Sequence, residues 1–530
     1  MKIFEPKIIS TLKNYSVSRG INDIVAGIIV AIIALPLSIA LAIASGVSPE
    51  QGLYTAIVAG FVIALFGGSR VNISGPTAAF ATIVAGIVVT HGVSGLIIAT
   101  ILAGIMLIIM GICRFGSLIK YIPMTITVGF TAGIAVTIIV GQIKDFLGLS
   151  FAEGTNAIET VEKLEAVAKS IDTFNPYALL VGAVGLAVLI LWPMLAKLKL
   201  GIFSKICSKI PPSIIAVIIG IFMVKFLPIN VNTIGTLYPE LSSEFPIPKI
   251  PNLSVDTISA VIPSAFTIAL LAAIESLLSC VVSDGMIGDR HNPNTELIAQ
   301  GMGNICSGLF GGIPATGAIA RTAANVKNGG RSPISGIVHA VVLLLFLLVL
   351  MPLAKMIPMP IIAAILFMVA YNMSEWRHFV HICKTAPKSD ILVLVLTFVL
   401  TVVFDLVVAI AVGLVVAAVL FVKRQSDECK VAAEGQNGTY VYKITGSLFF
   451  ANCEKLAVLM PSEDTQQITV DLSGVTSIDA TAIKSFTELY DACKKSGIKL
   501  EFLNIGKQPL RVLKKSGFDE LLCNNELENV

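Results

Sequence analysis

Leu65-Phe66-Gly67-Gly68 recurs far along the chain as Leu309-Phe310-Gly311-Gly312. Each copy ends an apolar run, and each leads into a segment interrupted by Gly and Pro: Ser69–Phe80 after the first copy and Ile313–Thr322 after the second. Interrupted apolar segments in matching places of an internal repeat indicate a binding site in a membrane carrier. Chance recurrence in a chain rich in Gly and Leu is the alternative, but it leaves the matching surroundings unexplained.

The composition is that of a membrane protein. Of 530 residues, 55% are hydrophobic and 13% are charged, whereas soluble domains carry about 25% charged residues. Apolar runs of helix-spanning length recur over residues 1–423, which predicts a polytopic membrane domain. The first run follows a polar, basic start and is itself long enough to span. We therefore expect no cleavable signal peptide.

Some function classes are disfavoured. The nine cysteines and five histidines show no metal-ligand spacing, so we expect no metal and no cofactor. No nucleophile lies beside a base in the sequence pattern, so we do not expect an enzyme. We also expect no nucleic-acid partner.

Fourteen apolar segments are predicted, seven in each half of the membrane domain. They lie at about 24–44, 51–67, 76–90, 94–113, 121–141, 176–196, 211–228, 257–283, 296–311, 316–327, 332–353, 358–372, 390–404 and 406–422. The third and tenth, with about fifteen and twelve residues at about 1.5 Å each, are too short to cross a bilayer as helices. We expect them to be half-helices completed by extended chain.

The distribution of charge predicts the orientation. With the N-terminus inside, the expected inner loops carry most Lys and Arg, and the long outer loop at about 142–175 is rich in Asp and Glu. Both termini are then cytoplasmic. Seven segments per half also make the repeat inverted, with halves at about 20–228 and 255–423.

Residues 424–530 form a second, cytoplasmic domain. Short β-type runs at 439–444, 467–472 and 498–503 alternate with helical stretches, which is typical of a small α/β fold. Asp479-Ala480-Thr481 stands where a strand and a tight turn lead into a helix. The N–H groups of that helix start could hold a phosphate, with a simple capped turn as the alternative.

The starts of the two half-helices are the candidate anion site. Pro76 suits a first helical turn, with Ser74 as the cap before it, and Thr316 and Gly317 open the matching segment. In an inverted repeat the two N-termini point at each other, and each offers partial positive charge and free N–H groups. A kinked helix with packing glycines is the alternative.

Two charged residues lie within apolar segments. Arg321, one turn into the tenth segment, could give an anion a fixed positive charge. Glu275, in the middle of the eighth segment, could bind and release a proton during transport. The alternative is a purely structural ion pair between Glu275 and Arg321.

At these residues the chain resembles the sulfate-permease (SulP) family of anion transporters. The resemblance rests on Ala34-Leu35-Pro36, Ser74–Ala79, the Glu275 segment, Gly311–Val326 and a C-terminal domain similar to STAS modules. It implies fourteen spans in two inverted repeats and an elevator-like movement of a core domain against a gate domain. The core would hold segments one to four and eight to eleven. It also implies a homodimer.

The resemblance assigns the anion site residue by residue. The positions are Pro76, Thr77 and Ala78 in the first half and Gly317, Ala318 and Ile319 in the second, with Arg321 nearby. Sodium-coupled bicarbonate members carry Asp and Thr in segment eight and Gly-Ala-Thr in segment ten. Here those positions are Glu275, Ser279 and Gly317-Ala318-Ile319, which favours proton over sodium coupling.

Two finer expectations follow from the resemblance. Phosphorylated STAS domains carry a Ser after the Asp, whereas Ala480 follows Asp479 here, with Thr481 a poor substitute. The runs Ala318–Val326 and Asn372–Glu375 look like the branch that contains the bacterial C4-dicarboxylate carrier.

We therefore expect proton-coupled uptake of sulfate or a C4-dicarboxylate across the cell membrane, with a cytosolic protein as a partner of the STAS-like domain. The alternatives are a sodium-coupled bicarbonate transporter, a nucleobase carrier of the same architecture, and a regulatory membrane scaffold.

Overall fold

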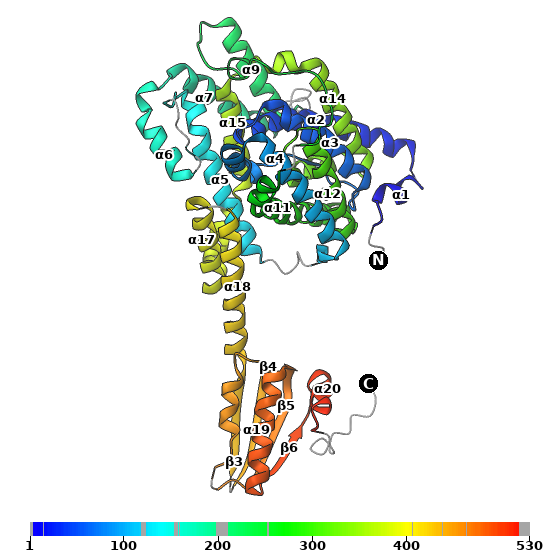
Figure 1. Ribbon diagram of the computed structural model, residues 1–530, viewed down its shortest axis with the longest axis vertical. Helices are drawn as coiled ribbons and strands as arrows, with labels where there is room; N and C mark the ends of the chain where they lie inside the picture. Colours follow the sequence, from blue (N-terminus) through cyan, green and yellow to red (C-terminus); the bar gives the residue numbers. More distant parts are fainter. Residues whose placement is uncertain are drawn as a thin grey trace. The chain divides into compact units, whose positions relative to one another are not determined.

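The computed structural model divides the chain into two compact units, Met1–Gly413 and Leu414–Val530 (Figure 1). It describes residues 4–13, 15–117, 123–152, 157, 159–197, 210–251, 254–404, 406–436, 438–462 and 464–518. Asp405, which the sequence places in a short outer turn, lies outside the described residues.

The first unit is helical, and each of the fourteen predicted apolar segments coincides with a helix. Within the described ranges, nine helices are long and apolar enough to cross a membrane. The helices are α1 (Lys7–Leu12), α2 (Val17–Ala44), α3 (Pro49–Phe66), η1 (Ala78–Phe80), α4 (Ala81–Ile112), α5 (Met124–Leu147), α6 (Thr160–Lys169), η3 (Ile171–Thr173), α7 (Pro176–Lys197), α9 (Pro212–Phe226), α10 (Ile234–Leu237), α11 (Val255–Ile287), α12 (Pro293–Leu309), α13 (Ile319–Lys327), α14 (Pro333–Ala354), α15 (Met359–Met373), α16 (Trp376–Thr385), α17 (Lys388–Val403) and α18 (Leu406–Glu428). The last of these begins in the first unit and ends in the second.

The helices of the first unit pack as two groups. One group holds α2, α3, α4, α11, α12, α13 and α14, and the other holds α5, α7, α9, α15 and α17. Small residues allow close approach inside the first group. At the crossing of α4 and α12, a Cβ added at Gly104 would lie 2.6 Å from the carbonyl oxygen of Gly301. The first group contains the segments that the family resemblance assigns to a core domain.

The break between the third and fourth segments is a kink. Gly92 interrupts α4 with φ 66° and ψ −177°, and the chain is helical on both sides. A positive φ is accessible to Gly at little cost, so the kink falls at this residue.

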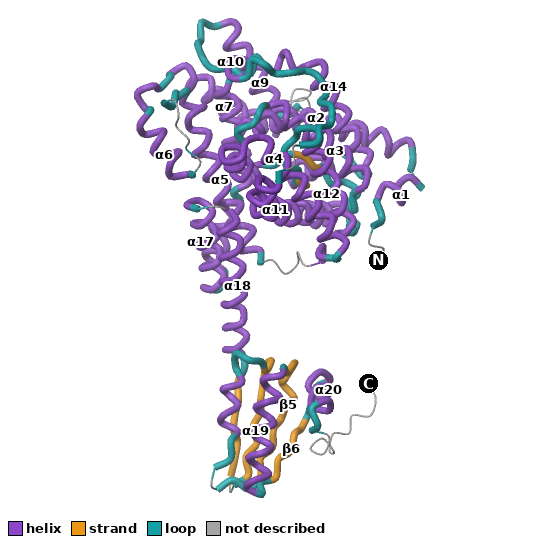
Figure 2. Tube along the Cα trace, in the orientation of Figure 1, coloured by secondary structure: helices purple, strands orange, loops and turns teal. Residues whose placement is uncertain are grey.

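The two interrupted segments meet as a short β-ladder inside the helical unit. Strand β1 (Ser74–Gly75) pairs antiparallel with β2 (Thr316–Gly317), in the register Ser74 to Gly317 and Gly75 to Thr316. Figure 2 shows these strands in orange among the surrounding helices. Antiparallel pairing between matching segments is what an inverted repeat predicts.

This ladder corrects the predicted helix starts. Ser74 is not a helix cap, Pro76 is not in a first helical turn, and Thr316 and Gly317 do not open a helix, because these residues are extended or precede the helices. The first helical residues are Ala78 and Ile319. Pairing with a partner far along the chain satisfies the N–H and C=O groups that a helix would otherwise use.

The second unit is an α/β domain with one four-stranded sheet in the order β3-β4-β5-β6. Strand β3 pairs antiparallel with β4, and β4, β5 and β6 are parallel. Its core includes Phe486 and Phe502, whose ring centroids lie 5.3 Å apart in an edge-to-face arrangement. The elements are β3 (Lys430–Gln436), β4 (Thr439–Leu448), η4 (Cys453–Leu459), β5 (Gln467–Ile478), α19 (Ala480–Ser496), β6 (Lys499–Leu503) and α20 (Lys507–Lys515).

Two features of this domain differ from the sequence pattern. Strand β3 was not predicted, and β5 continues to Ile478 through the expected turn, because Gly474 and Val475 pair with β4.

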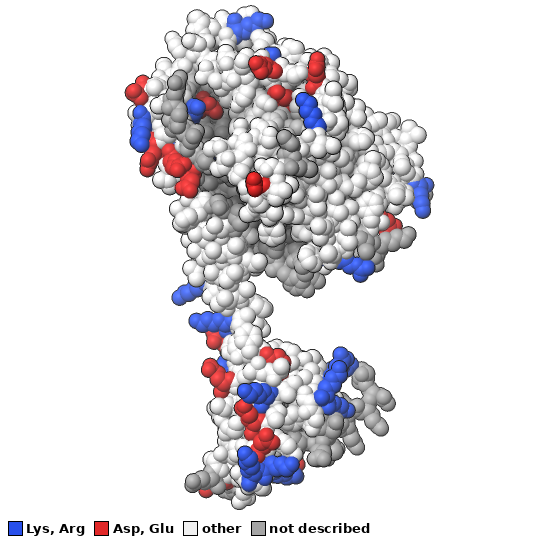
Figure 3. Space-filling model, viewed as in Figure 1, with Lys and Arg blue, Asp and Glu red and all other residues white. Residues whose placement is uncertain are grey.

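Figure 3 shows charges of both signs on the second unit, whereas the visible face of the helical unit is mostly uncharged.

Candidate functional site

The β-ladder places the N-terminal ends of two helices beside it. Thr77 precedes η1 and α4, Ala318 precedes α13, and both have extended backbones. In the described part of the chain, neither helix start is capped by the side chain of its N-cap residue. Because the strands are antiparallel, the chain leaves the ladder in opposite directions, and the two N-termini face each other across it. Each adds partial positive charge to the site.

Arg321 reaches from α13 to the opposite interrupted segment. Its side chain is buried, and Nη2 donates to the carbonyl oxygen of Pro76 at 3.1 Å. Nη1 lies so close to the backbone that a Cβ at Gly75 would be 2.6 Å from it. Among the described residues, Nη1 has no hydrogen-bond partner. A buried cation with an unused donor is suited to hold an anion.

Glu275 contacts the first interrupted segment from α11. Its Oε2 accepts a hydrogen bond from Thr77 Oγ1 at 3.0 Å. No ion pair joins Glu275 to Arg321 in the described part of the chain, so the structural ion pair considered from the sequence is not formed. The carboxylate and the guanidinium instead contact consecutive residues, Thr77 and Pro76.

The next residue of α11 contacts the second interrupted segment. Ser276 Oγ accepts a hydrogen bond from the Gly317 N–H at 3.0 Å and lies 2.7 Å from Thr316 Oγ1. Neighbouring residues of one helix therefore touch both halves of the site.

Ser279 lies behind the ladder rather than in an open position. Its hydroxyl donates to Asn72 Oδ1 at 2.7 Å and lies 3.1 Å from Thr322 Oγ1. The hydroxyl of Thr322 in turn accepts from the Ile73 N–H at 3.0 Å. Ser279 thus belongs to a buried polar network that ties α11 to both interrupted segments.

The structure brings the predicted site residues of the two halves together around the ladder. Pro76 and Ala78 are buried, Thr77 is half-buried, and Ile319 is 42% exposed. The exposed Ile319 side chain is aliphatic and carries no hydroxyl. Thr316, Gly317 and Ala318 are buried on and beside the second strand of the same ladder, where Thr316 pairs with Gly75.

Sequence reasoning missed Glu296, a fully buried carboxylate on α12. Its Oε2 accepts from the N–H groups of Gly68 and Ser69 at 2.9 and 3.1 Å. Its Oε1 accepts from Asn72 Nδ2 at 2.8 Å and Gln300 Nε2 at 3.0 Å. The spacing of Glu296, Gln300 and Asn304 on one face of an apolar helix was the available signal.

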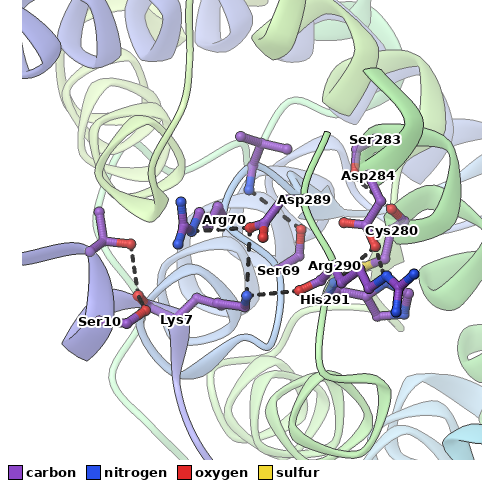
Figure 4. A network of polar contacts seen from close by, with 12 residues as sticks. Lys7, Ser10, Ser69, Arg70, Cys280, Ser283, Asp284, Asp289, Arg290 and His291 are labelled. Atoms are coloured by element: carbon purple, nitrogen blue, oxygen red, sulfur yellow. Dashed lines mark hydrogen bonds and ion pairs between the residues drawn. The ribbon is translucent and has the colours of Figure 1, made fainter. Parts of the chain in front are cut away.

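A charged cluster joins the N-terminal segment to the loop that follows the first Leu-Phe-Gly-Gly copy. Arg70 Nε and Lys7 Nζ lie 3.1 and 3.5 Å from Asp289 Oδ2. The backbone N–H of Lys7 donates to the Gly67 carbonyl oxygen at 2.9 Å. Figure 4 shows this cluster with the neighbouring pair of His291 and Asp284. These contacts join α1, the loop after α3 and the loop between α11 and α12.

In the second unit, Asp479 caps α19. Its Oδ1 accepts from the N–H groups of Thr481 and Ala482, both at 2.9 Å, and Oδ2 accepts from the Phe450 N–H at 2.9 Å. The side chain therefore occupies the N–H groups considered for phosphate binding. Asp479, Ala480 and Thr481 form a capped helix start.

Two protein-family models match the chain, and several known transporters are similar to it in sequence. The model of the Sulfate permease family matches residues 21–397, and that of the STAS domain matches residues 430–529. A putative sulfate transporter of Bacillus subtilis, YvdB, is 38% identical over 518 residues, which cover 95% of each chain. The bicarbonate transporter BicA of Picosynechococcus sp. is 32% identical over 466 residues, 82% of this chain and 80% of that protein.

The fold is similar to that of a solved anion transporter. The structure of murine Solute Carrier 26 family member A9 in the inward-facing state superposes with a TM-score of 0.87. The match covers 97% of this chain and 90% of the other at 19% sequence identity.

Proposed function

The chain belongs to the Sulfate permease family of membrane anion transporters, and we propose that it takes up sulfate or a C4-dicarboxylate together with protons. The observation that carries this proposal is the pair of contacts on one segment: Glu275 with Thr77, and Arg321 with Pro76. The site then has an anion-binding cation and a separate carboxylate that is free to take up a proton.

The geometry suggests how a proton promotes anion binding. An anion held by Arg321 and the two helix N-termini is repelled by an ionised Glu275 close by. Protonation of Glu275 removes that negative charge, so proton and anion bind together. On the other side of the membrane, loss of the proton restores the repulsion and favours release of the anion.

Two observations favour protons over sodium as the coupling ion. Ile319 offers no oxygen ligand, and hard cations require oxygen ligands in proteins. The hydroxyl of Ser279 is already engaged by Asn72 and Thr322. Sodium-coupled bicarbonate transport is therefore the alternative that the experiment below must exclude.

The packing of the helical unit supports an elevator-like mechanism. The ladder, α11 and α13 all belong to one of the two helix groups, so the site can move as part of that group. We propose that this group moves against the other in a homodimer in the cell membrane, with both termini in the cytoplasm. A cytosolic protein is the proposed partner of the STAS domain.

Uptake into proteoliposomes tests the proposal. Labelled sulfate, succinate, fumarate and bicarbonate are supplied outside, with an inward proton gradient or an inward sodium gradient. We expect the proton gradient to drive accumulation of sulfate or a dicarboxylate. Failure of all four anions, accumulation driven by sodium alone, or inhibition by uracil would each contradict it.

A further inference from the structure

Helix α12 carries a line of polar side chains on one face. Glu296, Gln300, Asn304 and Ser307 are all fully buried, and their spacing places them on successive turns. Polar groups inside a membrane domain are costly unless they are paired, and they mark functional positions. Each of these four side chains forms a hydrogen bond with a residue in 68–74 or in 313–315.

The first two residues of this line hold the first interrupted segment. Glu296 accepts from the backbone of Gly68 and Ser69 and from the side chain of Asn72. One turn further on, Gln300 Nε2 donates to Ser74 Oγ at 2.9 Å. The carboxylate thus holds the chain just before β1, and the amide reaches β1 itself.

The last two residues hold the second interrupted segment. Asn304 donates to the Ala315 carbonyl at 2.9 Å and accepts from the Ala315 N–H at 2.8 Å. Ser307 Oγ donates to the Ile313 carbonyl at 2.8 Å. The chain leading into β2 is therefore held by the same face of the same helix.

The line of polar side chains on α12 is not repeated at the matching positions of α3. Aligning the two Leu-Phe-Gly-Gly copies places α3 on α12, with Pro49 opposite Pro293. The matching residues on α3 are then Gly52, Ala56 and Gly60 opposite Glu296, Gln300 and Asn304. Gly60 lets the backbone approach closely, since a Cβ there would lie 3.2 Å from the Ser74 carbonyl oxygen. Helix α3 thus has small residues at these three positions, and its own hydrogen bond to the second segment comes from another position, where Thr55 Oγ1 accepts from the Ile313 N–H at 2.7 Å.

We infer that Glu296 and Asn304 are positioning residues of the anion site, and that α12 sets the separation of the two helix N-termini. The inference rests on the proposed function in so far as the positioned site binds an anion. Weakening either end of the polar line shifts one half of the site relative to the other. The consequence is a change in anion affinity and preference, beyond a loss of stability.

Two variants and a matched control separate positioning from stability. Glu296→Gln replaces one carboxylate oxygen by an NH2 group, so it removes two of the four hydrogen bonds that Glu296 accepts, three of which come from Gly68, Ser69 and Asn72. Asn304→Asp removes the amide donor at the second segment. The control is Asp23→Asn. Asp23 is also fully buried and accepts hydrogen bonds from Tyr15, Arg331 and Ser332, but it contacts neither β-strand.

The transport measurement compares KM, Vmax and competition between sulfate and succinate in proteoliposomes. We expect both test variants to raise KM roughly tenfold, which corresponds to about 1.4 kcal/mol of lost binding free energy. Both variants should also shift the sulfate-to-succinate preference in the same direction. The control should lower thermal stability and leave KM unchanged. Test variants that behave like the control would overturn the inference.

Amide hydrogen exchange in detergent gives a readout that needs no substrate. Glu296→Gln should speed exchange at Gly68 and Ser69 and also at 313–318, because one helix holds both segments. Faster exchange at the first segment alone would refute the shared support, even if the wild-type protein transported none of the tested anions. A wild-type protein that transported none of the tested anions would contradict the proposed function, and it would leave this exchange measurement valid.

Discussion

Thr77 donates its hydroxyl hydrogen to Oε2 of Glu275 across 3.0 Å, although the two residues belong to different halves of the repeat. The contact joins the N-cap of the first half-helix to the one carboxylate that α11 presents to the site in the described structure. A proton on Glu275 therefore acts directly beside a helix start that faces the anion. This relationship makes the coupling proposal open to mutational tests.

Glu275→Gln should separate anion movement from the proton. Glutamine keeps an oxygen that accepts the Thr77 hydrogen bond, but it does not titrate near neutral pH. We expect concentrative uptake under an inward proton gradient to be lost, while exchange of internal for external anion persists. Counterflow and gradient-driven uptake in the same vesicles measure the two activities, and proton dependence equal to that of the wild type would rule out this role.

Arg321→Gln should weaken anion binding. The change removes the buried positive charge and its unused Nη1 donor, and hydrogen bonds to charged groups contribute about 1.5–3 kcal/mol. We expect KM to rise by about 10- to 100-fold. Arg331→Gln is the matched control, because Arg331 Nη1 also donates to backbone carbonyls, those of Val326 and Gly330, away from the ladder. Equal KM values for the two variants would contradict the assignment.

Gly75→Ala should disturb the same guanidinium from the backbone side. The added Cβ would lie 2.6 Å from Arg321 Nη1, so the side chain must move. We expect reduced anion affinity with expression close to that of the wild type. Gly86→Ala in α4 provides the control, since a Cβ there meets no atom within 4 Å. Radiolabelled anion uptake compares the two, and an unaffected Gly75→Ala protein would argue against a fixed Arg321.

Asp471→Asn should destabilise the STAS domain in a pH-dependent way. Burial raises the pKa of Asp471, but hydrogen bonds from the Ser473 N–H and Asn504 Nδ2 outweigh it, and the pKa is held below its usual value. This contribution to stability is present above the unfolded pKa of about 3.9 and is lost as the pH falls through the folded pKa.

Hydrogen exchange of β5 and β6 in the full chain checks this prediction. Exchange in the Asp471→Asn protein should exceed that of the wild type at pH 7, and the difference should shrink at the acidic end of the stable range. A difference that does not depend on pH would point to lost packing instead.

The helix positions were predictable because burial in a bilayer imposes length and apolarity on each segment independently of its partners. Arg321 and Glu275 stood out for the same reason, since charges are rare in such segments. Glu296 did not, because an acidic residue in the first turn of a helix is ordinary in sequence. Strand β3 was missed because its run Lys430–Gln436 has little β-type character and is completed by pairing with β4.

The sequence by itself determined a membrane-spanning chain with a repeated, twice-interrupted scaffold, a separate α/β domain and charge chemistry confined to the second half. Those features follow from hydrophobicity, turn residues and the cost of buried charge, all of which act locally along the chain. Only the tertiary structure decided that Ser74–Gly75 and Thr316–Gly317 are strands, because each supplies the hydrogen bonds that the other lacks. It likewise decided that Glu275 bonds to Thr77 and that Arg321 bonds to Pro76, since such partners are chosen by proximity in space.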